Sequence, residues 1–126
     1  HLTRGGVMIT QASSPFFARK AFLCIDKTIQ SAGFTTLPMH NAIPTLGQWG
    51  WILAVDKELI SADSLKKMAG QLTFDAIDTR FINQEAMISM VHFGKGVFDI
   101  KEDIRINTSR QPMLYKYYHQ GTWGIY

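Results

Sequence analysis

The sequence predicts an α/β fold in the order strand, helix, strand, strand, with the last two strands antiparallel. Three observations support this prediction. A short apolar, β-branched run at residues 6–10 follows a Gly-Gly turn. A helix with start and stop signals covers residues 15–32. Two strand-like segments, residues 35–43 and 49–55, are then joined by a linker short enough for a hairpin.

The first strand, residues 6–10, is expected to be buried on both faces of a parallel sheet, because it is short, apolar and β-branched. The helix that follows can be capped by Ser13 or Ser14, and Gly33 suits the left-handed position after its last turn. Apolar residues recur inside it at spacings of three and four, which predicts one buried face.

The hairpin strands differ in their expected positions. Pro38 lies inside residues 35–43 and lacks an N–H, so this strand is expected at the edge of the sheet or with a bulge. Residues 49–55 are continuously apolar and are expected in the centre. A right-handed crossover makes the first hairpin strand parallel to residues 6–10, so the hairpin turn should lie at the carboxyl end of that first strand.

Three shorter helices are predicted in the rest of the chain, at residues 61–69, 83–93 and 112–118. A polar, irregular segment at 94–110 separates the last two. Ser61 caps the first of them and Gly70 ends it, and Gly94 ends the second. We therefore expect one partial domain over residues 1–126. Its sheet and long helix occupy residues 1–55, and a helical extension occupies residues 56–126.

Composition excludes several classes of protein. The formal net charge is +3 and the 13 Lys and Arg are scattered, so no nucleic-acid partner is expected. The single cysteine, Cys24, rules out an intrachain disulfide and lies in an apolar run typical of a buried side chain. The cysteine and the four histidines show no metal-ligand spacing. No apolar run approaches the roughly 18–20 residues of a membrane span.

Candidate binding residues lie where two segments reach one end of the sheet. Ligands of open α/β sheets bind beyond the carboxyl ends of parallel strands. Gln11 follows the first strand and can both donate and accept hydrogen bonds. The hairpin linker is expected at the same end, where Pro44, Leu46, Gln48 and Trp49 could form a wall. The alternatives are that Gln11 only satisfies loop backbone and that Trp49 is a core residue.

Asp75 and Asp78 have the spacing of an acid pair on one face of a helix. Catalysis would also require a cleft around them, and we assign them no catalytic role. The chain contains no G-x-G-x-x-G, P-loop or G-x-S-x-G motif. The residues alone therefore indicate half of a nucleotide-type α/β domain and no reaction.

A combination of two motifs carries a family resemblance. Residues 5–11 read G-G-V-x-x-x-Q and residues 43–50 read I-P-T-x-G-x-W-G. Together with residues 79–93 and 110–123, they resemble the C-terminal part of the polyamine aminopropyltransferase (spermidine synthase) family. The sequence is most similar to the long bacterial form, whose catalytic domain follows a membrane-spanning region.

The resemblance implies the C-terminal half of a Rossmann-like, methyltransferase-type sheet. Members of this family transfer an aminopropyl group from decarboxylated S-adenosylmethionine to putrescine. The glycine-rich nucleotide loop and the catalytic Asp would lie upstream of residue 1, in an absent N-terminal half. This chain alone is therefore expected to bind no cofactor, to contain no catalytic residue and to be inactive. Decarboxylated S-adenosylmethionine would be a co-substrate of the longer protein.

Site residues follow from the resemblance by position. Gln11 matches the family's glutamine beside the polyamine, and the run around Pro44 matches the loop that walls the amine site. Leu46 stands where many short-form members have tyrosine, and leucine has no hydroxyl group to contact the amine. The substrate-binding residues expected in this chain are Gln11, Pro44, Thr45, Leu46, Gln48 and Trp49.

Two other functions compete with this interpretation: a fragment of another S-adenosylmethionine-dependent transferase, such as a methyltransferase, and a non-catalytic interaction module. The pattern of Gln11 with residues 44–49 favours an aminopropyltransferase. We also expect a homo-oligomer, formed through an exposed sheet edge or helix face. The resemblance implies a cytoplasmic domain, with any membrane anchor in the absent N-terminal region.

Overall fold

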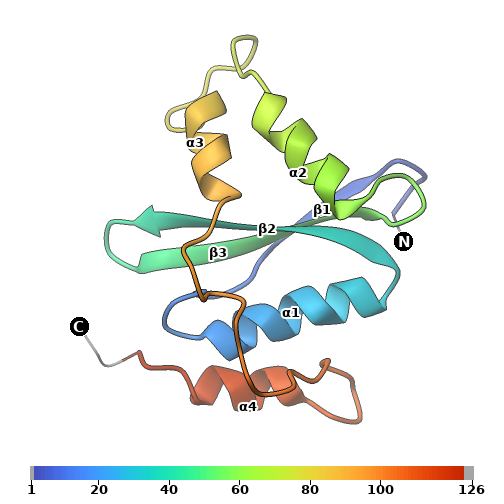
Figure 1. Cartoon of the computed structure of the whole chain (residues 1–126), viewed down its shortest axis with the longest axis vertical. Helices are drawn as coiled ribbons and strands as arrows, with labels where there is room; N and C mark the ends of the chain where they lie inside the picture. Colours follow the sequence, from blue (N-terminus) through green and yellow to red (C-terminus); the bar gives the residue numbers. More distant parts are fainter. Residues whose placement is uncertain (1, 124–126) are drawn as a thin grey trace.

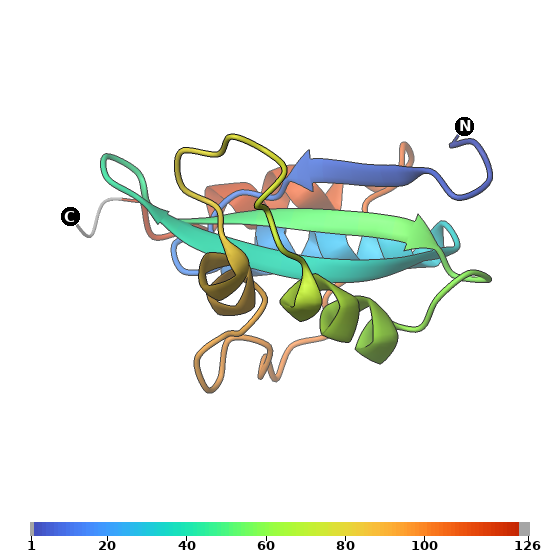
Figure 2. The ribbon, with the colours of Figure 1, turned by 90° about the horizontal axis from the view of Figure 1, so that it is seen from above.

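The computed structural model describes residues 2–123 and shows the predicted α/β order. Its sheet contains β1 (Val7–Gln11), β2 (Phe34–Ile43) and β3 (Gly47–Asp56), in the spatial order β1-β3-β2. The central β3 pairs antiparallel with both neighbours, so β1 and β2 run in the same direction. The β2–β3 turn therefore lies at the carboxyl end of β1, as predicted (Figure 2).

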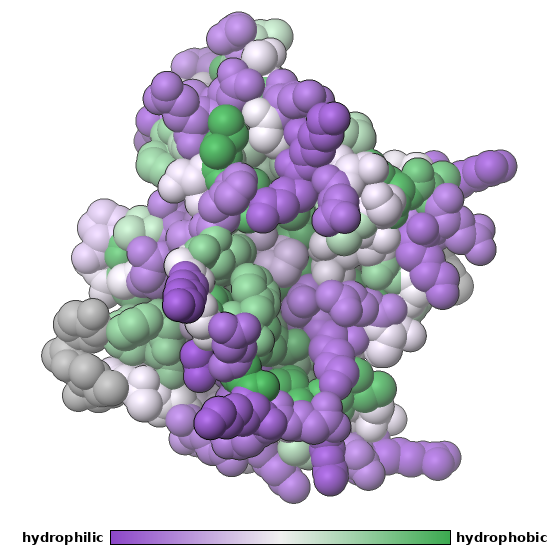
Figure 3. All heavy atoms as spheres, viewed as in Figure 1, coloured by the Kyte–Doolittle hydropathy of each residue, from purple (hydrophilic) through white to green (hydrophobic). Residues whose placement is uncertain are grey.

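Helices cover both faces of the sheet (Figure 1). The long helix α1 (Arg19–Ser31) packs on one face, and α4 (Met113–His119) packs on the outside of α1. The helices α2 (Ala62–Gln71) and α3 (Gln84–Met90) form a pair on the opposite face. Figure 3 shows apolar side chains gathered in the middle of one side of the molecule, between the α2–α3 pair and α4.

The apolar core has three parts, one for each of these contacts. Leu37, Met39 and Val55 of the sheet pack with Leu65 of α2 and Met87 of α3. On the other face, Phe22 of α1 packs against Ala12 and Ile52. Between α1 and α4, Cys24 packs with Ala21, Ile104 and Tyr117. Cys24 is fully buried, as its apolar neighbours predicted, and burial raises the pKa of its thiol.

The helix boundaries follow from their caps. Ser14 Oγ accepts hydrogen bonds from the amides of Phe16 and Phe17, but the N-cap of α1 is Ala18, which makes no side-chain capping bond, so the predicted serine cap of the helix is wrong. The regular helix begins at Arg19, because residues 15–18 form turns. Gly33 has a φ of +95°, as expected for the left-handed residue after the helix.

Each short helix begins one residue later than predicted, and its last residue differs from the prediction by one to three positions. Ser61 caps α2 by accepting from the amide of Ser64, and Asn83 caps α3 by accepting from Ala86. Gly70 does not end α2, which continues to Gln71. The helix α3 ends at Met90, before the predicted stop at Gly94. Between α3 and α4 the chain has no regular helix or strand, as predicted.

Of the strand predictions, one is wrong. The strand β1 is not buried on both faces, since Val7 is 59% and Ile9 is 60% exposed. The reason is that β1 lies at an edge, and the α2–α3 pair covers the β2 side of the sheet. The prediction that residues 35–43 form an edge strand is confirmed for β2, whose pairing with β3 is continuous through Pro38 without a bulge.

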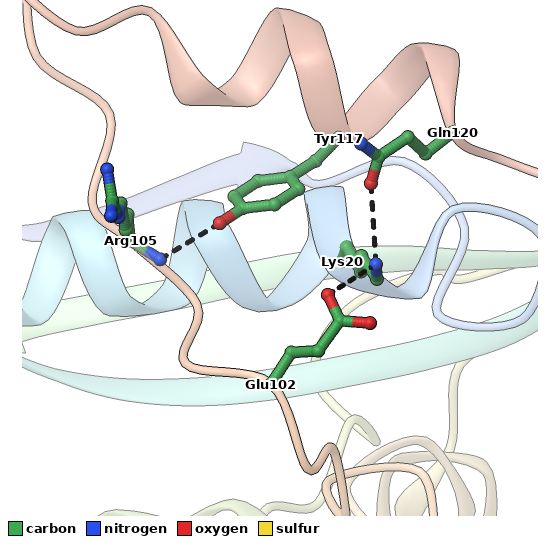
Figure 4. Close-up of polar contacts among 5 residues, drawn as sticks. All are labelled: Lys20, Glu102, Arg105, Tyr117 and Gln120. Carbon is green, nitrogen blue, oxygen red and sulfur yellow. Dashed lines mark hydrogen bonds and ion pairs between the residues drawn. The ribbon is translucent and has the colours of Figure 1, made fainter.

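Polar contacts hold the C-terminal segment on α1 (Figure 4). The Lys20 ammonium lies 2.6 Å from the Glu102 carboxylate and 3.4 Å from the Gln120 amide oxygen. The buried Tyr117 accepts a hydrogen bond from the backbone amide of Arg105 through its hydroxyl oxygen. These contacts fix α4 and the residues that follow it against the start of α1.

A buried carboxyl group lies between α1 and β2. Asp26 is 9% exposed, and its Oδ2 accepts a hydrogen bond from Gln30, which also donates to Thr36. Its Oδ1 has no hydrogen-bond partner among the described residues. Burial raises the pKa of this carboxyl, and the hydrogen bonds from Thr36 and Gln30 oppose that change.

Asp26→Asn is expected to raise the free energy of unfolding at pH 7 by about 1 kcal/mol, because it removes a buried charge and retains the side-chain shape. The folded-state pKa of Asp26 is raised, so the wild-type chain loses stability as the pH rises from about 4 through that pKa. The advantage of the variant should therefore shrink toward pH 3. Thermal unfolding of both proteins across this pH range measures it, and an advantage that grows in acid would contradict the assignment.

Candidate functional site

The carboxyl end of β1 is shaped by a close backbone contact with β3. The amide of Ala12 donates to the Gly50 carbonyl at 2.8 Å, and the amide of Gly50 donates to the Ser13 carbonyl at 2.6 Å. Ser13 has a φ of 65°, in the left-handed region, which turns the chain sharply toward α1. Gln11, the last residue of β1, is therefore held at this edge with an exposed side chain.

The β2–β3 turn lies beside it. Residues 44–46 connect paired residues Ile43 and Gly47, and the Leu46 amide donates to the Ile43 carbonyl at 3.0 Å. Gly47 has a φ of +72°, the left-handed conformation that a three-residue hairpin loop requires at this point. A Cβ there would lie 3.0 Å from the Phe17 ring, so glycine also permits the close approach of the turn to the start of α1.

Two neighbouring hollows meet at this end of the sheet. The strand hollow, of about 720 Å³, is lined by Gln11, Ser13 and Trp49 and by α4 residues that include Tyr115 and Tyr118. The hairpin hollow, of about 700 Å³, is lined by residues 44–47 together with Phe17, Trp49, Tyr118 and Trp123. Trp49 and Tyr118 line both hollows, so the two form adjoining parts of one candidate site.

Five of the six predicted binding residues line these hollows: Gln11, Pro44, Thr45, Leu46 and Trp49. The sixth, Gln48, is not among the residues that line them. Its Oε1 lies 3.0 Å from Nδ1 of His40 on the neighbouring strand. Successive side chains of a strand point to opposite faces, which separates Gln48 from Trp49. The substrate-binding roles of all six stay predictions.

Aromatic side chains form much of the hairpin hollow. Trp123 is the centre of this group, with ring centroids 5.1 Å from Tyr118, 6.0 Å from Phe17 and 6.1 Å from Trp49. Its indole Nε1 donates to the Tyr118 carbonyl, and the neighbouring Thr122 amide donates to the Phe17 carbonyl at 2.7 Å. The end of the described chain is thereby tied to the start of α1.

Sequence reasoning missed Tyr118 and Trp123 as site residues, since aromatic side chains near a short helix more often serve only for packing. The available signal was the density of aromatic residues in 115–123. That density could not indicate the side of the sheet on which the segment packs.

Charged chemistry is sparse at the site. Within residues 2–123, no carboxylate lines either hollow. Asp75 and Asp78 lie in the α2–α3 loop, at the end of those helices remote from the sheet (Figure 1). No group of three His, Cys, Asp or Glu side chains in the described residues could hold a metal ion. None of the described helices has the length and apolar character needed to cross a membrane.

Comparison with known proteins identifies relatives along the whole chain. A 27% identical stretch of 125 residues, 99% of this chain, occurs in polyamine aminopropyltransferase 2 of Ralstonia nicotianae and covers 22% of that protein. Polyamine aminopropyltransferase of Leptospira interrogans is 31% identical over 112 residues, 89% of this chain and 20% of its own length. The chain thus spans about a fifth of the length of these curated relatives.

Another relative has a higher sequence identity over a shorter stretch of the chain. Polyamine aminopropyltransferase of Mycobacterium tuberculosis is 38% identical over 73 residues, 58% of this chain and 14% of its own length. The spermine/spermidine synthase domain matches residues 1–67, which contain α1, all three strands, Gln11 and the hairpin turn. Because this domain match covers more than half of the 126 residues of the chain, the chain belongs to the spermine/spermidine synthase domain family.

Proposed function

We propose that this chain forms the C-terminal, acceptor-facing part of an aminopropyltransferase that uses decarboxylated S-adenosylmethionine as donor and putrescine or a related amine as acceptor. The observation that carries the proposal is the meeting of Gln11, Trp49 and the 44–46 turn around two adjoining hollows at the carboxyl end of β1. Membership of the spermine/spermidine synthase domain family favours this activity over methyl transfer or a purely structural role.

The reaction requires alignment more than activation of the leaving group. The amine nitrogen attacks the methylene carbon next to the sulfonium, the carbon–sulfur bond breaks, and its electron pair neutralises the sulfur as a thioether. The attacking nitrogen loses one proton, which a base must accept. Holding the two reactants in line supplies much of the remaining rate enhancement.

This chain would supply a wall of the acceptor pocket. Gln11 can accept a hydrogen bond from the amine and thereby orient it, while Trp49, Pro44 and Leu46 contact its methylene groups. The described residues that line the hollows include no carboxylate, so we propose that the base and the donor site belong to other parts of the enzyme. On this basis the 126-residue chain alone is inactive.

Gln11→Ala, in an intact aminopropyltransferase that contains this segment, is expected to raise KM for the amine about five- to tenfold, the effect of one lost hydrogen bond of roughly 1 kcal/mol. KM for the sulfonium donor should stay unchanged, because Gln11 faces the acceptor. Steady-state kinetics with each substrate varied in turn measures both constants.

The matched control is Gln71→Ala, which removes the same side chain from the exposed end of α2. It should leave both constants unchanged. If Gln11→Ala changed only KM for the sulfonium donor, the proposed contact between Gln11 and the acceptor amine would be contradicted.

We further propose that the isolated chain self-associates through β1. This strand has a free edge in the described sheet, and the exposed Val7 and Ile9 lie on it. An unpaired edge of apolar residues is a template for pairing with a second strand. A two-fold dimer that pairs the two β1 edges is the simplest closed arrangement.

A further inference from the structure

We propose that the hairpin hollow is an ammonium-binding subsite in which Trp123 and Tyr118 hold the non-reacting, protonated end of the acceptor amine. This inference rests on the proposed function and adds residues from beyond α4 to the acceptor site. Four aromatic side chains, from α4, the segment after it, β3 and the turn before α1, line the hollow: Phe17, Trp49, Tyr118 and Trp123.

The geometry of the rings suits a compact cation better than a flat ligand. Trp123 makes interplanar angles of 30°, 42° and 48° with Phe17, Tyr118 and Trp49. Centroid separations of 5.1–6.1 Å place the Trp123 ring beside each of these three rings. None of the three rings is parallel to Trp123, so together they form a tilted aromatic wall along the hollow. Aromatic ring faces attract ammonium ions within about 6 Å of the ring centroid.

The remaining lining fits an aliphatic chain with a charged end. Pro44 and Leu46 supply apolar contacts for methylene groups, and the Thr45 hydroxyl can accept a hydrogen bond from an N–H. No lysine, arginine or histidine is among the described residues that line the hairpin hollow, so nothing in this lining repels a cation. The hairpin hollow shares Trp49 and Tyr118 with the strand hollow, and one extended amine would occupy both.

The chemistry of the acceptor gives the two hollows different tasks. A diamine has two amino groups, of which the attacking one must be neutral when its nitrogen forms the new carbon–nitrogen bond. The distal amino group stays protonated near neutral pH and needs a partner for its charge. The strand hollow with Gln11 would receive the reacting end, and the aromatic wall around Trp123 would hold the distal ammonium.

The first test uses the 126-residue chain and two probes of equal length, butylamine as a cation and 1-butanol as its neutral counterpart. Chemical-shift titrations should show tighter binding of butylamine at neutral pH. Trp123→Leu should weaken butylamine binding about fivefold or more, while binding of 1-butanol changes little. Equal affinity for the two probes, or unchanged butylamine binding in Trp123→Leu, would overturn the proposal.

Two further variants separate the aromatic face from other effects. Trp123→Phe keeps an aromatic ring but loses the hydrogen bond from Nε1 to Tyr118, and it should retain the preference for the cation. Phe81→Leu removes an exposed aromatic ring from the α2–α3 loop and should bind both probes like the wild type. Two results would count against a role for the Trp123 ring face. One is a loss of the preference for butylamine over 1-butanol in Phe81→Leu. The other is a preference in Trp123→Phe as low as that of Trp123→Leu.

The second test uses an intact aminopropyltransferase that contains this segment, with putrescine and butylamine as acceptors. Trp123→Leu should raise KM for the diamine about fivefold, with little change for the monoamine, which has no distal ammonium. An equal rise for both acceptors would overturn the assignment. If butylamine binding to the chain depends on Trp123 but Gln11→Ala leaves amine kinetics unchanged, the ammonium subsite stands and the proposed role of Gln11 fails.

Discussion

Gly50→Ala is expected to lower the free energy of unfolding by about 3 kcal/mol, the upper range for overpacking a core. A Cβ on Gly50 would lie 2.6 Å from Cε2 and 2.7 Å from Cδ2 of Phe22. That ring is fully buried and packs against Ala12 and Ile52, so it cannot turn out into solvent. The same Cβ would lie 3.1 Å from the Ser13 carbonyl oxygen, so the loop after β1 would also be displaced.

Chemical denaturation measures this loss, and Gly94→Ala is the matched control. A Cβ at Gly94 meets no atom within 4 Å, so this variant should be within about 0.5 kcal/mol of the wild type. Equal stability of the two variants would contradict the close packing of Phe22 on β3. The contact also explains why glycine follows tryptophan in the I-P-T-x-G-x-W-G motif, since the Phe22 ring occupies the space of a side chain.

Ile9→Lys is expected to prevent the proposed self-association of the 126-residue chain, because a charged side chain on an edge strand opposes strand pairing. The two edges of the sheet are protected differently. On β2, Pro38 lacks the N–H that strand pairing uses, whereas β1 has neither proline nor charge. Ile9 is 60% exposed, so lysine should cost the folded monomer little.

Sedimentation velocity at micromolar concentrations measures the change in mass. Ile77→Lys makes the same substitution at a 64% exposed residue in the α2–α3 loop and should leave association intact. A wild-type chain that sediments as a folded monomer, or equal dissociation by both variants, would contradict pairing through β1.

The sequence predicted those features whose signals are local. Gly33 marked the end of α1 because a left-handed residue after a helix favours glycine, and Pro38 marked an edge strand because it has no N–H. The burial of β1 was predicted wrongly for the opposite reason. Val7 and Ile9 have the same local pattern whether or not another element covers them, and that cover depends on distant parts of a fold.

The candidate site divides in the same way. Gln11 and the 44–46 turn could be placed together because the crossover rule sets their relative position. The contribution of Trp123 could not be predicted, since it depends on Tyr117 packing α4 against α1 and on a hydrogen bond between residues 105 positions apart, from Thr122 to Phe17. Neither contact has a periodic or motif signal in the sequence.

The late position of Tyr118 and Trp123 in the sequence affects the order in which the hairpin hollow is completed during synthesis. The walls of the hairpin hollow leave the ribosome at different times, because 69 residues separate Trp49 from Tyr118. At a synthesis rate of about 5–20 residues per second, that interval lasts about 3–14 s. During this interval the rings of Tyr118 and Trp123 are absent, so Phe17, Leu46 and Trp49 present additional apolar surface. The proposed ammonium subsite is therefore complete only after Trp123 has been synthesised.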